Sequence, residues 1–328
     1  MYKNILKSIL GLVIGGFFLY LTLNKKPLDD IFNSLSSARL KWVIISVICL
    51  LATFYIRAIR WKVLLESSDT QPGKYNVVHS LVMGYLVNSF TPKFGEIIRC
   101  TALKKSEQIP TSISLGTVVS ERIYDILILV SGLFIILYIE IERLGSVVTG
   151  LKRSVAYAVS TNTLSTILVI SSITLVIFLA YRLSRRNKVA ATVSNFFKET
   201  GRSIKMSFKI KNYKRFIFLT VLIWIVLILV NYSFLMALPE TKGYSFYFAT
   251  LVLFIGGVGW ALPSPGGIGT TNFMILQLFV AFSLDDTIGV SFGLLASGIT
   301  FFVTVSFGAF AIVFDLIRKR YISKRGNE

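Results

Sequence analysis

The chain has 328 residues, of which 54% are hydrophobic, and carries a formal net charge of +19. Its mean hydropathy of +0.71 reflects many apolar runs. Two cysteines and one histidine exclude a disulfide framework and a histidine-cluster metal site, so we expect no metal and no other cofactor.

Six apolar runs predict helices that cross a lipid bilayer, because about 20 apolar residues in a helix span its hydrocarbon core of about 30 Å. The backbone of such a run can satisfy its own hydrogen bonds only as a helix or in a closed barrel, and no alternating strand pattern is present. The sequence therefore predicts an all-α polytopic membrane protein. The six runs cover residues 5–23, 42–56, 123–139, 164–181, 216–238 and 287–314.

Two shorter apolar segments are interrupted by helix breakers. The first consists of residues 77–90 and 96–105 around Thr91–Gly95, and the second of residues 246–262 and 269–282 around Pro263–Gly269. We expect each to be a broken re-entrant pair that enters and leaves on one side, although two complete crossings would preserve the same topology.

The positive charge lies between and beyond the apolar runs. Eleven Lys or Arg residues occur between Arg182 and Arg215, against one acid, Glu199. This pattern follows the positive-inside rule and favours contact with anionic lipid headgroups rather than with nucleic acid. We expect a multi-pass protein of the cytoplasmic membrane with both termini in the cytoplasm, including a basic tail at 318–328.

The two halves of the chain show the same order of segments. The helix beginning at Trp42 corresponds to the one beginning at Phe216, and Pro92 corresponds to Pro263. The number of residues between the two members is nearly the same for both pairs. Each half holds three crossings and one broken pair, so the second half should be inverted relative to the first. We expect one domain over 1–320 with repeats at about 1–140 and 160–317. Coincidence between two hydrophobic halves is the alternative.

Both breaks should place a helix amino terminus inside the membrane. Thr91, with Pro92 at the first helical position, and one of Thr270, Thr271 or Asn272 are the expected caps. Such termini bind anions, although a tight turn between packed helices needs the same residue types. The expected binding residues at the breaks are Pro92, Gly95, Pro263, Pro265, Gly266, Gly267 and Gly269.

Charged residues near or within the apolar runs form a second candidate site. A charge in mid-membrane costs at least about 2.5 kcal/mol unless it is paired or hydrated. We therefore expect an interior network in which four cations face three acids, leaving one spare cation to attract a phosphate. A structural lattice without a ligand is the alternative. The seven residues are Arg57, Arg60, Glu96, Arg99, Glu121, Arg122 and Asp125.

Four segments resemble those of the lysylphosphatidylglycerol synthase transmembrane, or flippase-like, family. They are Arg57–Trp61, Asn88–Arg99, Glu121–Asp125 and Leu262–Gly269, in the same order as in the family. The resemblance runs from about Met1 to Arg320. It implies a domain that moves lipids between leaflets, as in the multiple peptide resistance factor, and it adds Asn88 to the binding residues.

The resemblance makes a lipid flippase the leading hypothesis, with a lipid-modifying enzyme as a separate partner. The soluble aminoacyl transfer domain of the full synthase lies beyond the flippase region, whereas this chain ends eleven residues after Ile317. No nucleotide-binding glycine loop indicates an ATP motor. We therefore expect no enzymatic activity. The alternatives are a membrane-embedded transferase that uses Glu121 and Asp125, and a non-transporting scaffold.

Overall fold

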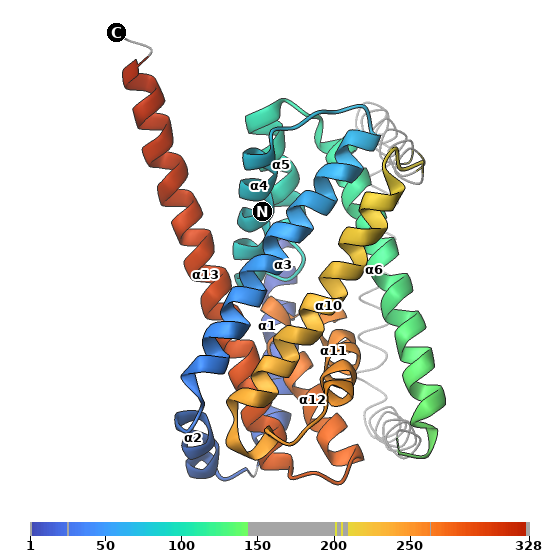
Figure 1. The fold of residues 1–328 in the computed structure, drawn as a ribbon. Coiled ribbons are helices and arrows are strands. Elements are labelled where there is room, and N and C mark those ends of the chain that lie inside the picture. The colour runs from blue at the N-terminus through green and yellow to red at the C-terminus, as the bar shows by residue number, and fades with distance from the viewer. Residues whose placement is uncertain are drawn as a thin grey trace.

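The computed structural model describes residues 2–24, 26–143, 201, 205, 209–262 and 264–325. The predicted crossing at 164–181, most of the basic loop before Phe216, Pro263 and residues 326–328 lie outside this range. The described parts of the chain are helical and contain no strand (Figure 1).

Four helices are long and apolar enough to cross a membrane. They are α3 (Leu40–Ser67), α6 (Thr111–Ile139), α10 (Tyr213–Ala237) and α13 (Asp286–Arg325). The predicted multi-pass all-helical architecture is thus confirmed. Helix α1 (Tyr2–Leu23) and the short α2 (Leu28–Ser36) precede them.

Helices α3 and α10 lie antiparallel and form the most extensive contact in the described structure (Figure 1). At one end the Arg39 amide donates to the Ala237 carbonyl at 2.8 Å. At the other, the Lys211 amide donates to the Ser67 hydroxyl at 3.3 Å. The two helices therefore run alongside each other over their full length.

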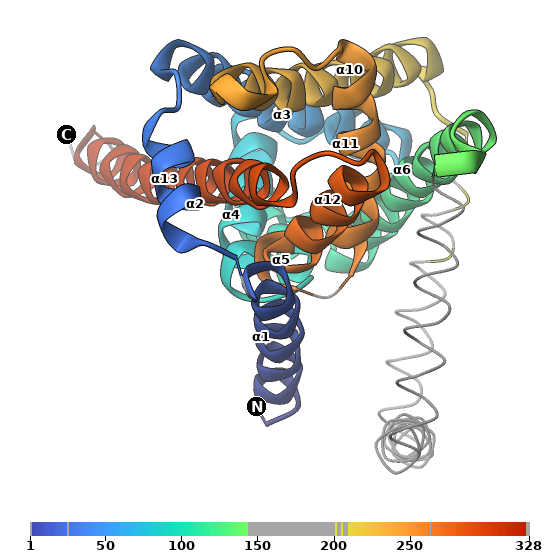
Figure 2. The same ribbon diagram turned by 90° about the horizontal axis from the view of Figure 1, so that it is seen from below.

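Two helical hairpins enter this frame from opposite ends, as Figure 1 shows. One consists of α4 (Lys74–Phe90) and α5 (Gly95–Glu107), and the other of α11 (Phe246–Ala261) and α12 (Thr270–Ala281). The 3₁₀ turn η2 (Pro265–Gly267) joins the second pair and contacts α4, so the tip of one hairpin reaches the other. Figure 2 shows α1 at the edge of this assembly, against α12.

Glycine allows α4 and α5 to pack backbone against backbone. A Cβ atom added to Gly95 would lie 1.8 Å from the carbonyl oxygen of Gly84. The second hairpin has a similar contact, since a Cβ on Gly259 would lie 2.5 Å from the Thr270 carbonyl oxygen. No larger residue fits at these points without separating the helices.

Each hairpin packs on its own hydrophobic cluster. Trp61, Leu81 and Leu103 belong to a buried cluster of α3 to α6. A second cluster draws mainly on α10 to α13, with Phe234 and Phe279 among its fully buried side chains. The polar residues described next lie on α3, α5 and α6, beside the first of these clusters.

Candidate functional site

Helix α3 is longer than predicted, and this changes the position of two arginines. The apolar run ends at Ile56, but the helix continues to Ser67. Arg57 and Arg60 therefore lie in the interior of the helix, beyond the end of the predicted apolar run. Arg60 is fully buried. A buried arginine needs partners, and carboxylates of α6 supply them.

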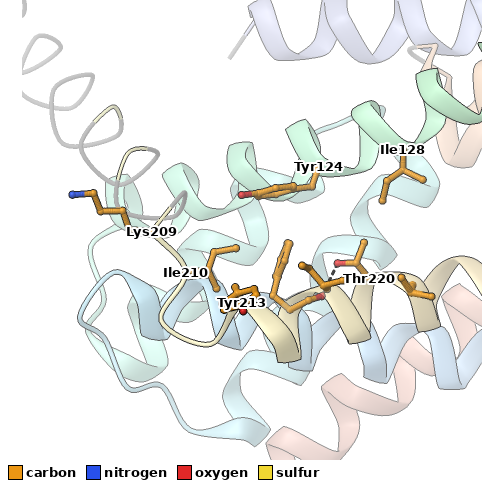
Figure 3. A pocket seen from close by; sticks show the side chains of 9 residues that line it. Tyr124, Ile128, Lys209, Ile210, Tyr213 and Thr220 are labelled. Atoms are coloured by element: carbon orange, nitrogen blue, oxygen red, sulfur yellow. Dashed lines mark hydrogen bonds between the residues drawn. The ribbon is translucent and has the colours of Figure 1, made fainter.

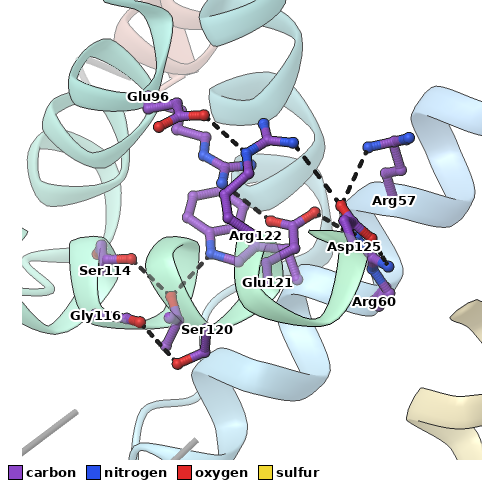
Figure 4. Close-up of polar contacts among 12 residues, drawn as sticks. Arg57, Arg60, Glu96, Ser114, Gly116, Ser120, Glu121, Arg122 and Asp125 are labelled. Atoms are coloured by element: carbon purple, nitrogen blue, oxygen red, sulfur yellow. Dashed lines mark hydrogen bonds and ion pairs between the residues drawn. The ribbon is translucent and has the colours of Figure 1, made fainter. Parts of the chain in front are cut away.

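Glu121 lies at the centre of the charged site. Its position ten residues after Thr111 puts it about 15 Å along α6. The side chain is buried, and each carboxylate oxygen accepts from a different helix (Figure 4). Oε1 accepts from Arg60 Nη2 of α3 at 2.9 Å, and Oε2 accepts from Arg99 Nη2 of α5 at 3.0 Å. Glu121 thus ties three helices together.

Asp125, one turn further along α6, completes the coordination of Arg60. Arg60 Nη1 donates to Asp125 Oδ1 at 2.7 Å and Nη2 donates to Oδ2 at 3.0 Å. This bidentate geometry is the strong form of an arginine–carboxylate pair. The i,i+4 spacing of Glu121 and Asp125 places both acids on one face of the helix.

The outer members of the network are held less tightly. Arg122 Nε donates to Glu96 Oε1 at 2.8 Å, and its Nη1 lies 3.8 Å from Asp125 Oδ2. Arg57 approaches Asp125 at 3.7 Å, and no hydrogen bond of Arg57 is found within the described residues. The seven predicted charged residues thus come together in one network of four cations and three acids.

Aromatic and hydroxyl groups position the buried arginines. The Arg99 guanidinium lies 4.8 Å from the centre of the Trp61 ring, and Arg60 lies 5.9 Å from that of Phe216. Trp61 in turn donates its indole N–H to the Thr117 hydroxyl at 3.0 Å. The Nε atoms of Arg60 and Arg99 have no hydrogen-bond acceptor within the described structure.

The predicted helix caps at the two breaks are wrong. Thr91 ends α4 and donates its hydroxyl to Val87, while α5 begins at Gly95, whose amide donates to the Asn88 side chain at 2.8 Å. Asn88 therefore reaches across the break from the preceding helix. In the second break, Gly269 precedes α12 and no side chain caps the helix.

The predicted residues of the second break do not join the charged network. Pro265 and Gly267 are buried in η2, and Gly266 approaches Ser89 at the end of α4. Gly266, Gly267 and Gly269 all have positive φ, which explains the glycines at these positions. Gly269 packs on Gly15 of α1. These residues shape the contact between the hairpins.

Sequence reasoning missed two residues at the meeting of the hairpins. Lys93, in the first break, has a left-handed backbone with φ of 61° and donates from Nζ to the Trp260 carbonyl oxygen at 3.3 Å. Its Nζ lies 4.4 Å from the centre of the Trp260 ring, and the Arg122 guanidinium lies 5.5 Å from that centre. A lysine within an apolar break was the signal that could have identified the site.

A cavity of about 640 Å³ lies between α6 and α10, as Figure 3 shows. Its walls are mainly apolar, and Lys209 stands at one end. It adjoins the network through Phe216, which faces both the Tyr124 ring and the Arg60 guanidinium. The residues that line it are Tyr124, Ile128, Lys209, Ile210, Tyr213, Phe216, Ile217, Thr220 and Val221.

No group of three His, Cys, Asp or Glu residues in the described ranges has the arrangement of a metal site. The acids of the network instead face arginine. Guanidinium groups bind carboxylates and other oxyanions alike, so the arginines of the network can bind an anionic ligand.

Comparison with known proteins agrees with this architecture. The family model for the lysylphosphatidylglycerol synthase transmembrane region matches residues 8–308. The UPF0104 membrane protein MJ1595 of Methanocaldococcus jannaschii is 28% identical, over 98% of each chain. The UPF0104 membrane protein PH1989 of Pyrococcus horikoshii is 20% identical, over 94% of this chain and 97% of that protein. No solved structure gives a significant match. The chain belongs to the lysylphosphatidylglycerol synthase transmembrane family.

Proposed function

We propose that the protein is a flippase that moves an anionic or zwitterionic phospholipid, or a polyprenyl-phosphate-linked amphiphile, between leaflets. One observation carries the proposal: a network of four arginines and three carboxylates, buried at its centre, lies on α3, α5 and α6 beside the meeting point of two broken hairpins. A phosphate headgroup would bind the excess positive charge while the acyl chains stay in lipid.

The charge balance supports a ligand over a closed structural lattice. Charged groups inside a membrane are expensive and face either one another or a functional cavity. Here Arg60 and Arg99 are matched by hydrogen-bonded carboxylates, but Arg57 is not. A lattice with only a structural role would gain by neutralising or omitting that residue.

An inverted repeat accounts for the arrangement of the helices. Helices α10, α11, α12 and α13 follow α3, α4, α5 and α6 at a nearly constant separation along the chain. Corresponding helices make corresponding contacts, since α5 packs on α6 as α12 packs on α13. The close contact of Gly84 with Gly95 has its counterpart in the contact of Gly259 with Thr270. Such repeats are typical of secondary transporters.

The hairpins have the dimensions of re-entrant pairs. Their helices contain 17, 13, 16 and 12 residues, which correspond to about 18 to 26 Å, shorter than the hydrocarbon core of about 30 Å. They enter from opposite ends of the molecule and meet at their tips (Figure 1). We propose that both breaks lie at mid-membrane, where a headgroup can be passed from one side to the other.

We place the protein in the cytoplasmic membrane with both termini in the cytoplasm. The basic carboxyl-terminal end of α13 extends beyond the α4–α5 end of the molecule in Figure 1. The positive-inside rule then puts that end in the cytoplasm. A separate lipid-modifying enzyme would supply the substrate, and anionic lipids would be the direct partners.

The geometry argues against the two alternatives. A transferase would use Glu121 or Asp125 as a base, but both oxygens of Glu121 and both oxygens of Asp125 accept hydrogen bonds from arginine. The arginines thus already occupy the oxygens that would have to accept a proton from a substrate. A scaffold would be expected to neutralise its arginines fully, which the 3.7 Å contact of Arg57 does not achieve.

Reconstitution of the purified protein tests the proposal. Vesicles with a fluorescent phospholipid in both leaflets are treated with an impermeant quencher, and loss of the inner-leaflet signal reports exchange. A second set contains a labelled polyprenyl phosphate. The wild type should increase the exchange of at least one of these lipids, and Arg57→Gln should reduce it.

The control is Lys211→Gln, which removes a cation from a pair whose side chains are 63% and 68% exposed. This variant should exchange lipid at the wild-type rate. The proposal fails if the wild type moves neither lipid, or if Arg57→Gln and Glu121→Gln, shown to be folded by size exclusion and thermal unfolding, both move lipid as fast as the wild type.

A further inference from the structure

The cation of Lys93 lies in an unusual environment. Its side chain comes from the turn between two helices too short to cross the bilayer, and no carboxylate within the described residues lies within ion-pair distance of it. Its polar contact is one long hydrogen bond to the Trp260 carbonyl. Lys93 and Trp260 are both exposed rather than packed in the core, so a ligand can reach them.

Arg122 offers two further donors at the same place. Its Nε atom is held by Glu96 at 2.8 Å, which orients the guanidinium group. Neither Nη1 nor Nη2 makes a hydrogen bond within the described structure. Arginine binds a phosphate through two such parallel donors. Arg122 is therefore oriented by one carboxylate and retains the donors that an oxyanion needs.

Trp260 brings the two cations together. The Lys93 and Arg122 charges lie 4.4 and 5.5 Å from the centre of its ring, and so at most about 10 Å from each other. They repel each other. An indole face stabilises a cation more weakly than an anion does. An anion that binds both cations would offset their mutual repulsion, and it would be a stronger partner for them than the indole ring.

We propose that Lys93 and Arg122, on the ring of Trp260, bind the phosphate group of a lipid headgroup. This rests on the proposed function, and it names the residues that contact the substrate. The site takes a phosphate monoester or diester, since its donors match oxygens that carry negative charge. The proposed site spans both hairpins, because Lys93 belongs to the α4–α5 hairpin and Trp260 to the α11–α12 hairpin.

Binding to the purified full-length protein tests the site. Native mass spectrometry measures the affinity for a short-chain phosphatidic acid, and calorimetry measures that for inorganic phosphate. Lys93→Gln should weaken binding at least about tenfold, because a charge-assisted contact is lost. Lys93→Arg should retain most of the affinity. Lys104→Gln, an exposed lysine at the other end of α5, should bind as the wild type does.

The two ligands distinguish the source of the phosphate. If the wild type binds inorganic phosphate and Lys93→Gln lowers that affinity, the site recognises the phosphate group alone. If Lys93→Gln lowers the affinity for phosphatidic acid and inorganic phosphate does not bind, the site needs the rest of the lipid as well. Equal affinities of wild type and Lys93→Gln for both ligands overturn the proposal. Lys93→Met, which retains the aliphatic stem, replaces Lys93→Gln if the latter does not fold.

Lipid exchange measured in parallel separates this site from the proposed function. If the wild type moves lipid and Lys93→Gln binds and moves it equally well, the site is wrong and the function stands. If Lys93→Gln loses binding but the wild type moves no lipid, the site stands and the flippase is wrong. Trp260→Phe, which keeps an aromatic face, should lose less affinity than Trp260→Ala.

Discussion

Arg60 and Glu121 form an ion pair at 2.9 Å in which the two side chains are 0% and 1% exposed. The pair joins α3 to α6 in a position where each helix alone would present an uncompensated charge to an apolar interior. Glu121 also accepts from Arg99, so one carboxylate satisfies two buried guanidinium groups. The stability of the first half of the molecule therefore depends strongly on this residue.

Glu121→Gln should destabilise the protein by about 3–5 kcal/mol, because it leaves buried Arg99 without a counter-charge and removes one of the two carboxylates that pair with Arg60. Thermal unfolding in detergent measures the loss. Lys211→Gln, which breaks an exposed pair, should change stability by less than about 1 kcal/mol. Similar unfolding temperatures for Glu121→Gln and wild type would show that the network is not a structural element.

Arg57→Gln should leave the fold intact and reduce lipid exchange about tenfold or more. Arg57 makes no hydrogen bond within the described residues, so its removal leaves no buried partner unsatisfied. The excess positive charge of the network falls, and with it the attraction for a phosphate. Exchange rates and unfolding temperatures are measured on the same preparation. A large drop in stability would instead assign Arg57 a structural role.

Gly95→Ala should destabilise the α4–α5 hairpin by about 1–3 kcal/mol or more, because its Cβ would lie 1.8 Å from the Gly84 carbonyl oxygen. Gly298→Ala on α13 is the matched control, since no atom lies within 4 Å of the added methyl group. Thermal unfolding compares the two variants. A stable Gly95→Ala protein would mean that the helices can separate without loss.

A cysteine at Ser106 should react with an impermeant reagent from the cytoplasmic side, and one at Ser36 from the opposite side. Ser106 lies in the last turn of α5 and Ser36 is the last residue of α2. The two helices lie at opposite ends of the molecule in Figure 1. The background carries Cys49→Ala and Cys100→Ala, since these are the two native cysteines. Labelling of both positions from one side would refute the proposed topology.

Ile217→Trp should slow lipid exchange by filling the cavity between α6 and α10 if that cavity receives an acyl chain. Ile126→Trp, on an exposed face of α6 outside the cavity, is the control. Exchange by the two variants is compared in vesicles of the same composition. Equal rates would exclude the cavity from the path of the lipid.

The sequence was sufficient to predict the long helices and the charged network. Lengths of apolar runs determine the crossings, and the spacings of Glu121 and Asp125 and of Arg57 and Arg60 place each pair on one face of a helix. The end of α3 was predicted too early because the apolar run stops before Arg57, whereas the helix continues to Ser67. Arg57 lies inside the helix, and its side chain approaches Asp125 of another helix at 3.7 Å.

The contact of Lys93 with Trp260 could not be predicted in the same way. The two residues are 167 positions apart and meet only because the two hairpin tips meet. The prediction of the helix cap at the first break was wrong for a related reason. A threonine next to a proline is a typical cap, but the Asn88 side chain reaches the Gly95 amide from the previous helix and occupies that role. Tertiary contacts decided both cases.

The backbone packing at Gly84 and Gly95 has a mechanical consequence. With no side chain between α4 and α5 there, sliding or opening within the hairpin would break direct main-chain contact. The same holds for α11 and α12 at Gly259. We therefore expect each hairpin to move as one rigid unit, so that in the proposed transport cycle a change of shape would fall at the contact between the hairpins, where the Lys93 side chain reaches Trp260.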